Sequence, residues 1–216
     1  MTDRTLVLVH GAWHGAWCWQ PVVDRLERSG IRVVAVELPF TSFEDDTAAI
    51  QAAVTDEDVV LCGHSYGGRL VSAAAGALPA VSHLVYLSSQ LLNAGQLAEY
   101  ARTPRATSTG IPDLDTVRGK YYNACSEADF RAAAGQLRSM VSVPGGLLGL
   151  ECRPWENATS TYIVCTRDRA IEPAAQRRMA ANTTYTVDIP ADHAAFFSAP
   201  DELSAILAAI VGSDRP

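Results

Sequence analysis

The sequence predicts an α/β protein, with a mostly parallel β-sheet flanked by helices. Short apolar runs of strand length alternate along the chain with segments whose apolar residues recur at helical spacing. This alternation is typical of a parallel sheet that is covered on both faces. A sharp, glycine-rich turn joins the third run to the next helical segment, and polar residues follow two of the later runs. The expected strands are residues 6–9, 31–36, 59–62, 83–87, 162–165 and 184–189.

The helices expected between these strands carry recognisable start and stop signals. The first begins with Pro21, whose missing N–H costs nothing in a first turn, and ends before Gly30. Later helices begin with Glu172 and with Asp201. Carboxylates in the first turn are stabilised by the positive end of the helix dipole. The expected helices are residues 21–28, 47–54, 65–77, 172–181 and 201–211.

Residues from 91 to about 157 interrupt the alternation. The segment holds short helical patterns and Gly and Pro breaks but no buried strand, and it is too long for a bare loop. We expect a compact insertion over the carboxyl edge of the sheet, where open α/β folds bind their ligands. A chain of 216 residues can bury one full core. The sequence therefore predicts a single domain over 1–216, with a small helical cap at about 91–157.

Composition excludes several classes of partner. The net charge of −7 and the absence of a Lys/Arg run argue against nucleic acid. No stretch of about 18 apolar residues is present, so no membrane partner is expected. The chain begins directly with a strand rather than a signal peptide, and its five cysteines are scattered without a C-x-x-C pair. We expect reduced thiols and a cytoplasmic protein, and the sequence leaves a homodimer open.

The turn after the third strand has the pattern G-x-S-x-G, at Gly63-His64-Ser65-Tyr66-Gly67. Glycines two places on either side of the serine let the turn close tightly, so that the hydroxyl projects above the sheet edge. The alternative is a strand-to-helix turn whose serine only caps the helix. The remaining polar residues of the chain favour Ser65 as a nucleophile.

A serine hydroxyl is a poor nucleophile at neutral pH and needs a general base, with an acid that orients the base. His193 follows the last expected strand, and Asp168 follows the strand before it. Both are therefore expected at the same sheet edge as Ser65. The chain order Ser, Asp, His is that of the serine hydrolases built on α/β sheets.

Three other carboxylates and two other histidines are weaker candidates. Glu37 is placed to line a cleft or pair with a basic side chain, and Asp188 lies within a strand. Asp192 is the neighbour of His193, which makes a bond to that ring awkward. Of the histidines, His83 opens a strand and His64 lies inside the turn.

An oxyanion hole requires two backbone N–H groups aimed at the developing negative charge. One is expected from Tyr66, the residue after the nucleophile, and the other from Ala12 in the glycine-containing loop after the first strand. Trp13 of that loop and the pair Tyr121 and Tyr122 are expected to line the substrate pocket. No H-E-x-x-H or paired C-x-x-C spacing is present, so no metal site is expected.

Taken together, these motifs resemble the α/β-hydrolase superfamily, and within it the group of plant methyl esterases, hydroxynitrile lyases and their small bacterial relatives. The resemblance extends over nearly the whole chain. It implies the α/β-hydrolase fold, a triad of Ser65, His193 and Asp168, an oxyanion hole from Ala12 and Tyr66, and a cap over a mostly apolar pocket. The motifs that carry it are residues 8–17, 63–68, 162–171 and 191–198.

Two departures from this group bear on the activity. Its lyases carry a threonine where this chain has Gly11 and a lysine where it has Ala194. We therefore expect a serine hydrolase that cleaves a small, mostly apolar carboxylic ester through an acyl-enzyme, with no metal or organic cofactor. A lyase, lactone-opening or acyl-transfer reaction at the same site is an alternative, because one fold hosts many chemistries. A non-catalytic small-molecule receptor is another.

Overall fold

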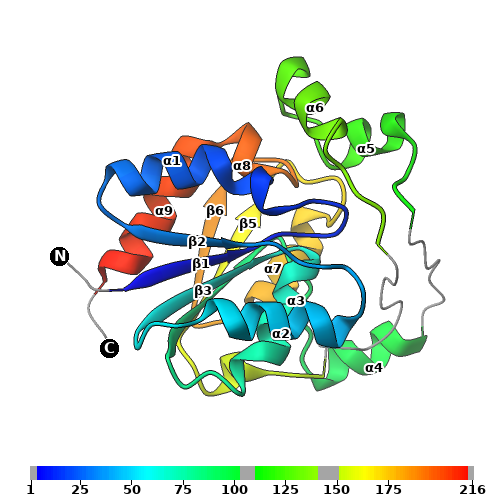
Figure 1. The fold of residues 1–216 in the computed structure, drawn as a ribbon. Helices are drawn as coiled ribbons and strands as arrows, with labels where there is room; N and C mark the ends of the chain where they lie inside the picture. Colours follow the sequence, from blue (N-terminus) through cyan, green and yellow to red (C-terminus); the bar gives the residue numbers. More distant parts are fainter. Residues whose placement is uncertain (1–3, 103–109, 141–150, 214–216) are drawn as a thin grey trace.

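The structure is a computed structural model that describes residues 4–102, 110–140 and 151–213. Its centre is a six-stranded sheet in the order β2-β1-β3-β4-β5-β6 (Figure 1), and every neighbouring pair is parallel. The α/β fold class is confirmed, and each expected strand overlaps an observed one. The strands are β1 (Thr5–Val9), β2 (Arg32–Val36), β3 (Val59–His64), β4 (Val81–Leu87), β5 (Ser160–Cys165) and β6 (Tyr185–Ile189).

Helices cover both faces of the sheet (Figure 1). Alternate side chains of a strand point to opposite faces, so Leu6 and Leu8 of β1 pack in one apolar core and Val7 and Val9 in the other. One face is covered by α1 (Gln20–Arg28), α8 (Ala195–Ser198) and α9 (Pro200–Gly212). The other is covered by α2 (Phe43–Ala53), α3 (Tyr66–Ala75) and α7 (Pro173–Ala180). None of the helices within the described residues combines the length and apolar character needed to cross a bilayer.

One helix starts earlier than its apolar pattern indicates. Helix α2 begins at Phe43 rather than at residue 47, because Ser42 caps it. The Ser42 hydroxyl accepts a hydrogen bond of 2.9 Å from the Asp45 backbone N–H. The signal was present as a serine followed three places later by an acidic residue, a variant of the capping box. A short 3-10 helix, η1 (Ala16–Trp19), also precedes α1.

The segment between β4 and β5, where the cap is expected, contains helices among its described residues. Two helices, α5 (Leu114–Lys120) and α6 (Glu127–Ala134), stand together, and α4 (Ala94–Arg102) lies apart from them (Figure 1). The Gln96 amide of α4 donates to the Arg178 carbonyl of α7 at 3.2 Å. A 3-10 helix, η2 (Pro154–Glu156), leads into β5. Residues 103–109 and 141–150 of the expected cap lie outside the described residues.

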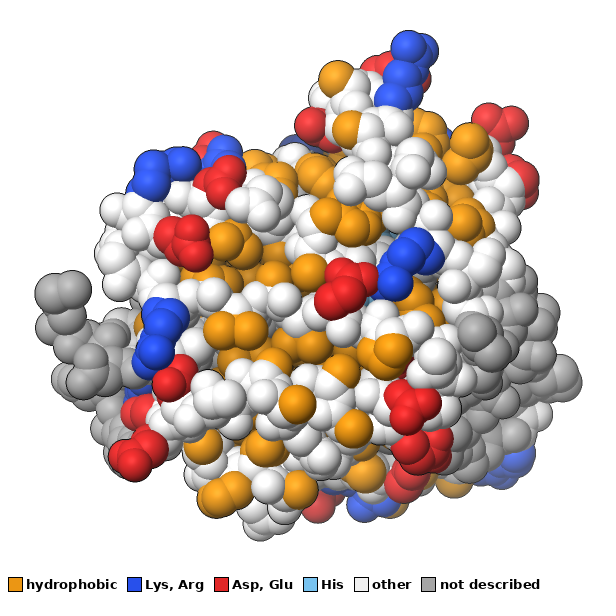
Figure 2. All heavy atoms as spheres, in the orientation of Figure 1, with side chains coloured by type: hydrophobic (Ala, Val, Ile, Leu, Met, Phe, Trp, Pro, Cys, Tyr) orange, Lys and Arg blue, Asp and Glu red, His pale blue; other side chains and the backbone are white. Residues whose placement is uncertain are grey.

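The surface drawn in Figure 2 carries basic and acidic side chains that are interspersed, with apolar side chains between them. A nucleic-acid surface requires clustered basic side chains. This face therefore has no basic patch of that kind, in agreement with the net charge of −7.

Candidate active site

Ser65 lies at the turn between β3 and α3, in a backbone conformation that only strong local constraints maintain. Its φ of 51° and ψ of −116° are rare for a residue with a side chain. The Ser65 N–H donates to the Leu87 carbonyl at 3.1 Å, and the Ser89 hydroxyl donates to the Ser65 carbonyl at 2.7 Å. The Ser65 side chain makes no capping hydrogen bond to α3, so the structure does not support the alternative of a helix cap.

The glycines of the turn are required by close backbone approach. A Cβ added to Gly63 would lie 2.6 Å from the Gly67 carbonyl oxygen, and one added to Gly67 would lie 2.6 Å from the carbonyl oxygens of Val9 and His10. A Cβ on Gly68 would overlap the Ser89 side chain. The turn therefore presses directly on the end of β1 and on the loop that follows it.

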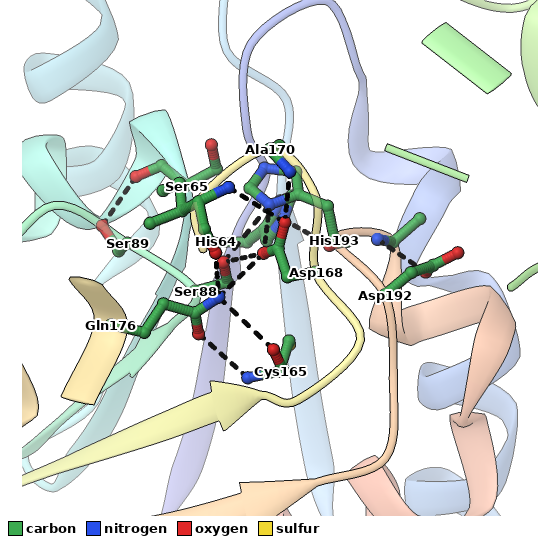
Figure 3. A network of polar contacts seen from close by, with 12 residues as sticks. His64, Ser65, Ser88, Ser89, Cys165, Asp168, Ala170, Gln176, Asp192 and His193 are labelled. Atoms are coloured by element: carbon green, nitrogen blue, oxygen red, sulfur yellow. Dashed lines mark hydrogen bonds and ion pairs between the residues drawn. The ribbon is translucent and has the colours of Figure 1, made fainter. Parts of the chain in front are cut away.

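His193 and Asp168 meet at the carboxyl edge of the sheet, as their positions after β6 and β5 predict. The His193 ring donates from Nδ1 to Asp168 Oδ2 at 2.8 Å, and both side chains are buried. Figure 3 shows Ser65 beside this pair, with the three residues contributed by three different loops. With Nδ1 occupied as a donor, Nε2 of a neutral His193 is left as the basic nitrogen.

The Asp168 carboxylate is held by several donors besides His193. Burial alone raises its pKa, but the charge and hydrogen bond of His193 outweigh that effect, with help from Ser88 and the Ile171 N–H. The resulting pKa lies below the usual value for Asp. The Gln176 amide donates to Oδ2 at 3.0 Å, and the Ser88 hydroxyl donates to the same oxygen.

The Ala170 and Ile171 N–H groups donate to Oδ1 at 2.7 and 3.0 Å. Ser88 and Gln176 were missed by sequence reasoning. Ser88 directly follows β4 at the same sheet edge, which was the one available signal. Gln176 lies inside α7, and only the packing of that helix against β5 brings it to the site.

Asp192 has a different role in the structure. It is fully buried, and its oxygens accept from the Ala124 N–H at 2.6 Å, the Ser198 hydroxyl at 2.7 Å and the Ala194 N–H at 3.0 Å. Asp192 therefore ties the loop after β6 to α8 and to the connection between α5 and α6. Figure 3 shows it set apart from the pair formed by His193 and Asp168.

The two other carboxylates that the sequence analysis set aside are also placed elsewhere. Glu37 pairs with Arg138 and accepts from the Ala16 N–H at 2.6 Å, which is the kind of basic partner expected for it. Asp188 forms an exposed two-fold ion pair with Arg177. Neither carboxylate contacts the ring of His193 in these interactions.

Ala12 and Tyr66 lie on the two segments that meet at Ser65. Tyr66 is the first residue of α3, so its N–H has no acceptor within the helix. Ala12 belongs to residues 10–15 between β1 and η1, here called the oxyanion loop after the role that the sequence predicts for Ala12. This loop contacts the turn, because a Cβ added to Gly11 would lie 3.1 Å from the Ser65 Cβ.

The aromatic residues expected to line the pocket separate into two groups. The Trp13 ring packs edge-on against Tyr121 at 5.6 Å, and Tyr121 packs against His193 at 5.4 Å. Tyr122, by contrast, is fully buried, and its hydroxyl lies 2.6 Å from His14 Nε2. Tyr122 is thus a core residue behind the oxyanion loop, and it offers no surface to a ligand.

Three buried histidines surround the site. Burial lowers the pKa of His10 to about 3 and that of His14 to about 4, and it lowers the pKa of His64 well below the usual value. The His64 ring lies 4.7 Å from the His193 ring, and its Nε2 donates to the His193 carbonyl at 2.9 Å. All three are therefore neutral near pH 7. Across the part of the chain that the structure describes, no three His, Cys, Asp or Glu side chains group as metal ligands.

Comparison with a family model places this geometry among known proteins. The sequence matches the model described as "Alpha/beta hydrolase family" over residues 6–206. Among curated proteins, it is similar to Methylesterase 18 of Arabidopsis thaliana, with 26% identity over all of both chains. It is also 29% identical to the alpha/beta hydrolase nvfD of Aspergillus novofumigatus, covering 93% of this chain and 94% of the relative.

Solved structures share the fold at low sequence identity. The chain superposes on polyneuridine aldehyde esterase with a TM-score of 0.79 and 23% identity, covering 96% of this chain and 98% of that one. It superposes on a pyrethroid hydrolase from Sphingobium faniae JZ-2 with a TM-score of 0.81 and 23% identity, covering 97% and 98%. These likenesses agree with the six-stranded sheet and its flanking helices.

Proposed function

Because the chain belongs to the alpha/beta hydrolase family, we propose that it is a serine hydrolase that cleaves a small, mostly apolar carboxylic ester. The observation that carries the proposal is the 2.8 Å hydrogen bond from His193 to Asp168, next to a serine held in a strained turn. This is the arrangement that turns a weakly acidic hydroxyl into a nucleophile.

In the proposed reaction the Ser65 hydroxyl attacks the ester carbonyl carbon, and His193 Nε2 takes its proton. The negative charge that develops on the carbonyl oxygen is stabilised by the N–H groups of Ala12 and Tyr66. His193 then gives the proton to the departing alcohol, leaving an acyl group on Ser65. A water molecule, activated by the same histidine, releases the acid. Asp168 holds the ring and stabilises its transient positive charge.

The aromatic side chains beside His193 and the names of the similar proteins both point to the class of substrate. Trp13 and Tyr121 offer aromatic surface beside His193, which suits an apolar acyl group. Relatives named methylesterases make methyl esters the first compounds to test. We further propose a cytoplasmic location, which the free thiols of Cys18, Cys62 and Cys125 support.

The lyase alternative has no support at Gly11 and Ala194, the two positions where the hydroxynitrile lyases carry a threonine and a lysine. A Cβ added to Gly11 would lie 2.8 Å from His64 Nδ1, and the His64 ring is fixed by its bond to the His193 carbonyl. A threonine at position 11 would therefore displace His64. The neighbour of His193, Ala194, is buried and uncharged, so it cannot stabilise a departing anion as a lysine would.

The proposal is tested by kinetics of Ser65→Ala with p-nitrophenyl acetate and a panel of methyl esters. Turnover should fall by at least about 10³-fold, because the nucleophile is removed. Ser29→Ala, at a hydroxyl bonded to the Arg25 carbonyl at the end of α1, is the matched control and should keep wild-type turnover. A folded Ser65→Ala protein with near wild-type turnover would exclude Ser65 as the nucleophile.

A further inference from the structure

Every carbonyl group of the oxyanion loop from Gly11 to His14 accepts a hydrogen bond. The Gly11 carbonyl accepts from His10 Nδ1 at 2.9 Å, and the Ala12 carbonyl accepts from His14 Nδ1 at 2.7 Å. The Trp13 carbonyl accepts from the Arg138 backbone N–H at 2.7 Å, and the His14 carbonyl accepts from Arg138 Nη2 at 3.2 Å. Each of these four consecutive peptide groups is therefore held by a hydrogen bond to its carbonyl oxygen.

These contacts matter because a peptide group is planar and trans. The carbonyl of one residue and the N–H of the next lie in the same plane and point in opposite directions. The bond from His10 to the Gly11 carbonyl therefore also fixes the direction of the Ala12 N–H. In the same way, the bond from His14 to the Ala12 carbonyl fixes the N–H of Trp13.

The hydrogen-bond partners of His10 and His14 show which ring nitrogen of each residue donates and which accepts. The Leu38 N–H donates to His10 Nε2 at 3.2 Å, so that nitrogen accepts and Nδ1 carries the hydrogen. His14 Nδ1 faces the Ala12 carbonyl and must donate, which leaves Nε2 to accept from the Tyr122 hydroxyl at 2.6 Å. Burial, which depresses the pKa of both rings, keeps each in this neutral form.

Arg138 joins the oxyanion loop to the segment that follows α6. Besides its two bonds to the loop, its Nη2 donates to the Leu38 carbonyl at 3.0 Å. Its guanidinium group lies over the Phe40 ring at 5.0 Å and pairs with Glu37. A single arginine thus holds the segment after β1 and the segment after β2 in one arrangement. All three of these polar contacts of the side chain, to His14, Leu38 and Glu37, are made by Nη2 at the far end of the guanidinium group.

We propose that His10, His14 and Arg138 form a loop brace that holds the Ala12 N–H in the direction needed to bind the oxyanion. These are positioning residues, and their assignment rests on the proposed function. The loop needs such support because Trp13 has a φ of 63°, a left-handed conformation that costs energy in a residue with a side chain. Donors fixed before the reaction stabilise the oxyanion without reorganising during it.

The first test is His10→Phe, which keeps a ring against Phe40, 5.3 Å away, but removes both nitrogens. With p-nitrophenyl acetate, kcat should fall about 10- to 100-fold, less than for complete loss of a donor, and KM should change little. The affinity for a trifluoromethyl ketone, which forms a tetrahedral oxyanion on the serine, should fall by a similar factor.

The matched control is His83→Phe. His83 is also buried, but it lies at the start of β4, where its Nε2 contacts the Thr161 hydroxyl at 2.8 Å. The kcat and the ketone affinity of His83→Phe should match the wild-type values. The proposed loop brace would be wrong if both variants lost kcat and ketone affinity equally, or if His10→Phe raised KM without changing kcat.

A second variant keeps the proposal testable if His10→Phe does not fold. Arg138→Lys retains the charge beside Glu37, but its side chain ends one bond short of the Nη2 position, so the ammonium does not reach the carbonyls of His14 and Leu38. Its kcat and ketone affinity should both fall by about tenfold. Arg131→Lys, at an exposed arginine of α6 paired with Glu127, is the control and should show neither loss.

The outcomes distinguish this proposal from the proposed function. A wild-type protein that neither hydrolyses the ester nor binds the ketone would overturn the proposed function and the brace together. An active wild-type protein whose His10→Phe or Arg138→Lys variant keeps full kcat and ketone affinity would overturn the brace alone.

Discussion

Two carboxylates, Asp168 and Asp192, lie close to His193, and only Asp168 bonds to its ring. The difference arises from backbone direction. Asp192 precedes His193, and its oxygens accept from the neighbouring Ala194 N–H and from Ser198. Asp168 reaches the ring from the adjacent strand end, where parallel strands bring their following loops together. Sequence reasoning could choose between them because the geometry of adjacent residues is restricted.

The roles of these carboxylates predict opposite effects of amide substitution. Asp168→Asn should lower kcat by about 10²- to 10⁴-fold, because the amide no longer holds His193 in the productive tautomer. Asp192→Asn should leave kcat within about tenfold but lower the melting temperature, because it weakens the bonds to Ala124 and Ser198. Steady-state kinetics and thermal melts of the two variants check this. A larger kcat loss for Asp192→Asn would show that the acid is misassigned.

At the scale of elements, the strands and most helices could be predicted because local signals and tertiary packing agree. The β1 residues alternate between two cores, and Pro21 and Gly30 bracket α1. The early start of α2 was missed because its apolar pattern is weak, although Ser42 marks the cap.

The expected insertion was harder to predict than the sheet. Its helices are short, and their positions depend on contacts with distant elements, such as the hydrogen bonds of Gln96 with Arg178 and Asn182 and the packing of Phe130 in the core. Tyr122 was expected to line the pocket for a related reason, since its burial in the core and its contact with His14 depend on tertiary packing. Sequence reasoning also could not find Arg138, whose partners lie far away along the chain, or Gln176, which reaches Asp168 only through the packing of α7 against β5.

The turn between β3 and α3 predicts a contrast between two glycines at the ends of the same helix. Gly67→Ala should lower the free energy of unfolding by about 1–3 kcal/mol, because its Cβ would press on the carbonyls of Val9 and His10. Gly76→Ala has nothing within 4 Å of the added Cβ and a helical φ of −63°, so it should be neutral or slightly stabilising. Urea unfolding of both variants measures the difference. Equal effects would contradict the described packing of the turn.

At the scale of the whole molecule, the buried histidines predict sensitivity to acid. The folded-state pKa values of His10 and His14 are about 3 and 4, below the value of about 6.5 expected in the unfolded chain. The unfolded state therefore binds more protons between these values, and the free energy of unfolding falls as pH falls. Their stabilising effect is complete above about pH 6.5 and is lost below it, by up to about 1.4 kcal/mol per histidine per pH unit.

Urea unfolding at pH 7.5, 5.5 and 4.5 measures this loss. The free energy of unfolding of His10→Phe should decline less steeply than that of the wild-type protein, because one histidine with a depressed pKa is gone. A free energy of unfolding that stays constant from pH 7.5 to 4.5 would contradict the burial of neutral histidines in the folded chain.

We propose that the whole fold brings Ser65, His193 and Asp168 together to activate one hydroxyl. The most direct measurement is mass spectrometry of the protein after reaction with a fluorophosphonate, which bonds covalently to activated serines. We expect one adduct, on the peptide that contains Ser65, with labelling lost in Ser65→Ala and strongly slowed in His193→Ala. An adduct on another residue, or labelling of folded Ser65→Ala at the wild-type rate, would contradict it.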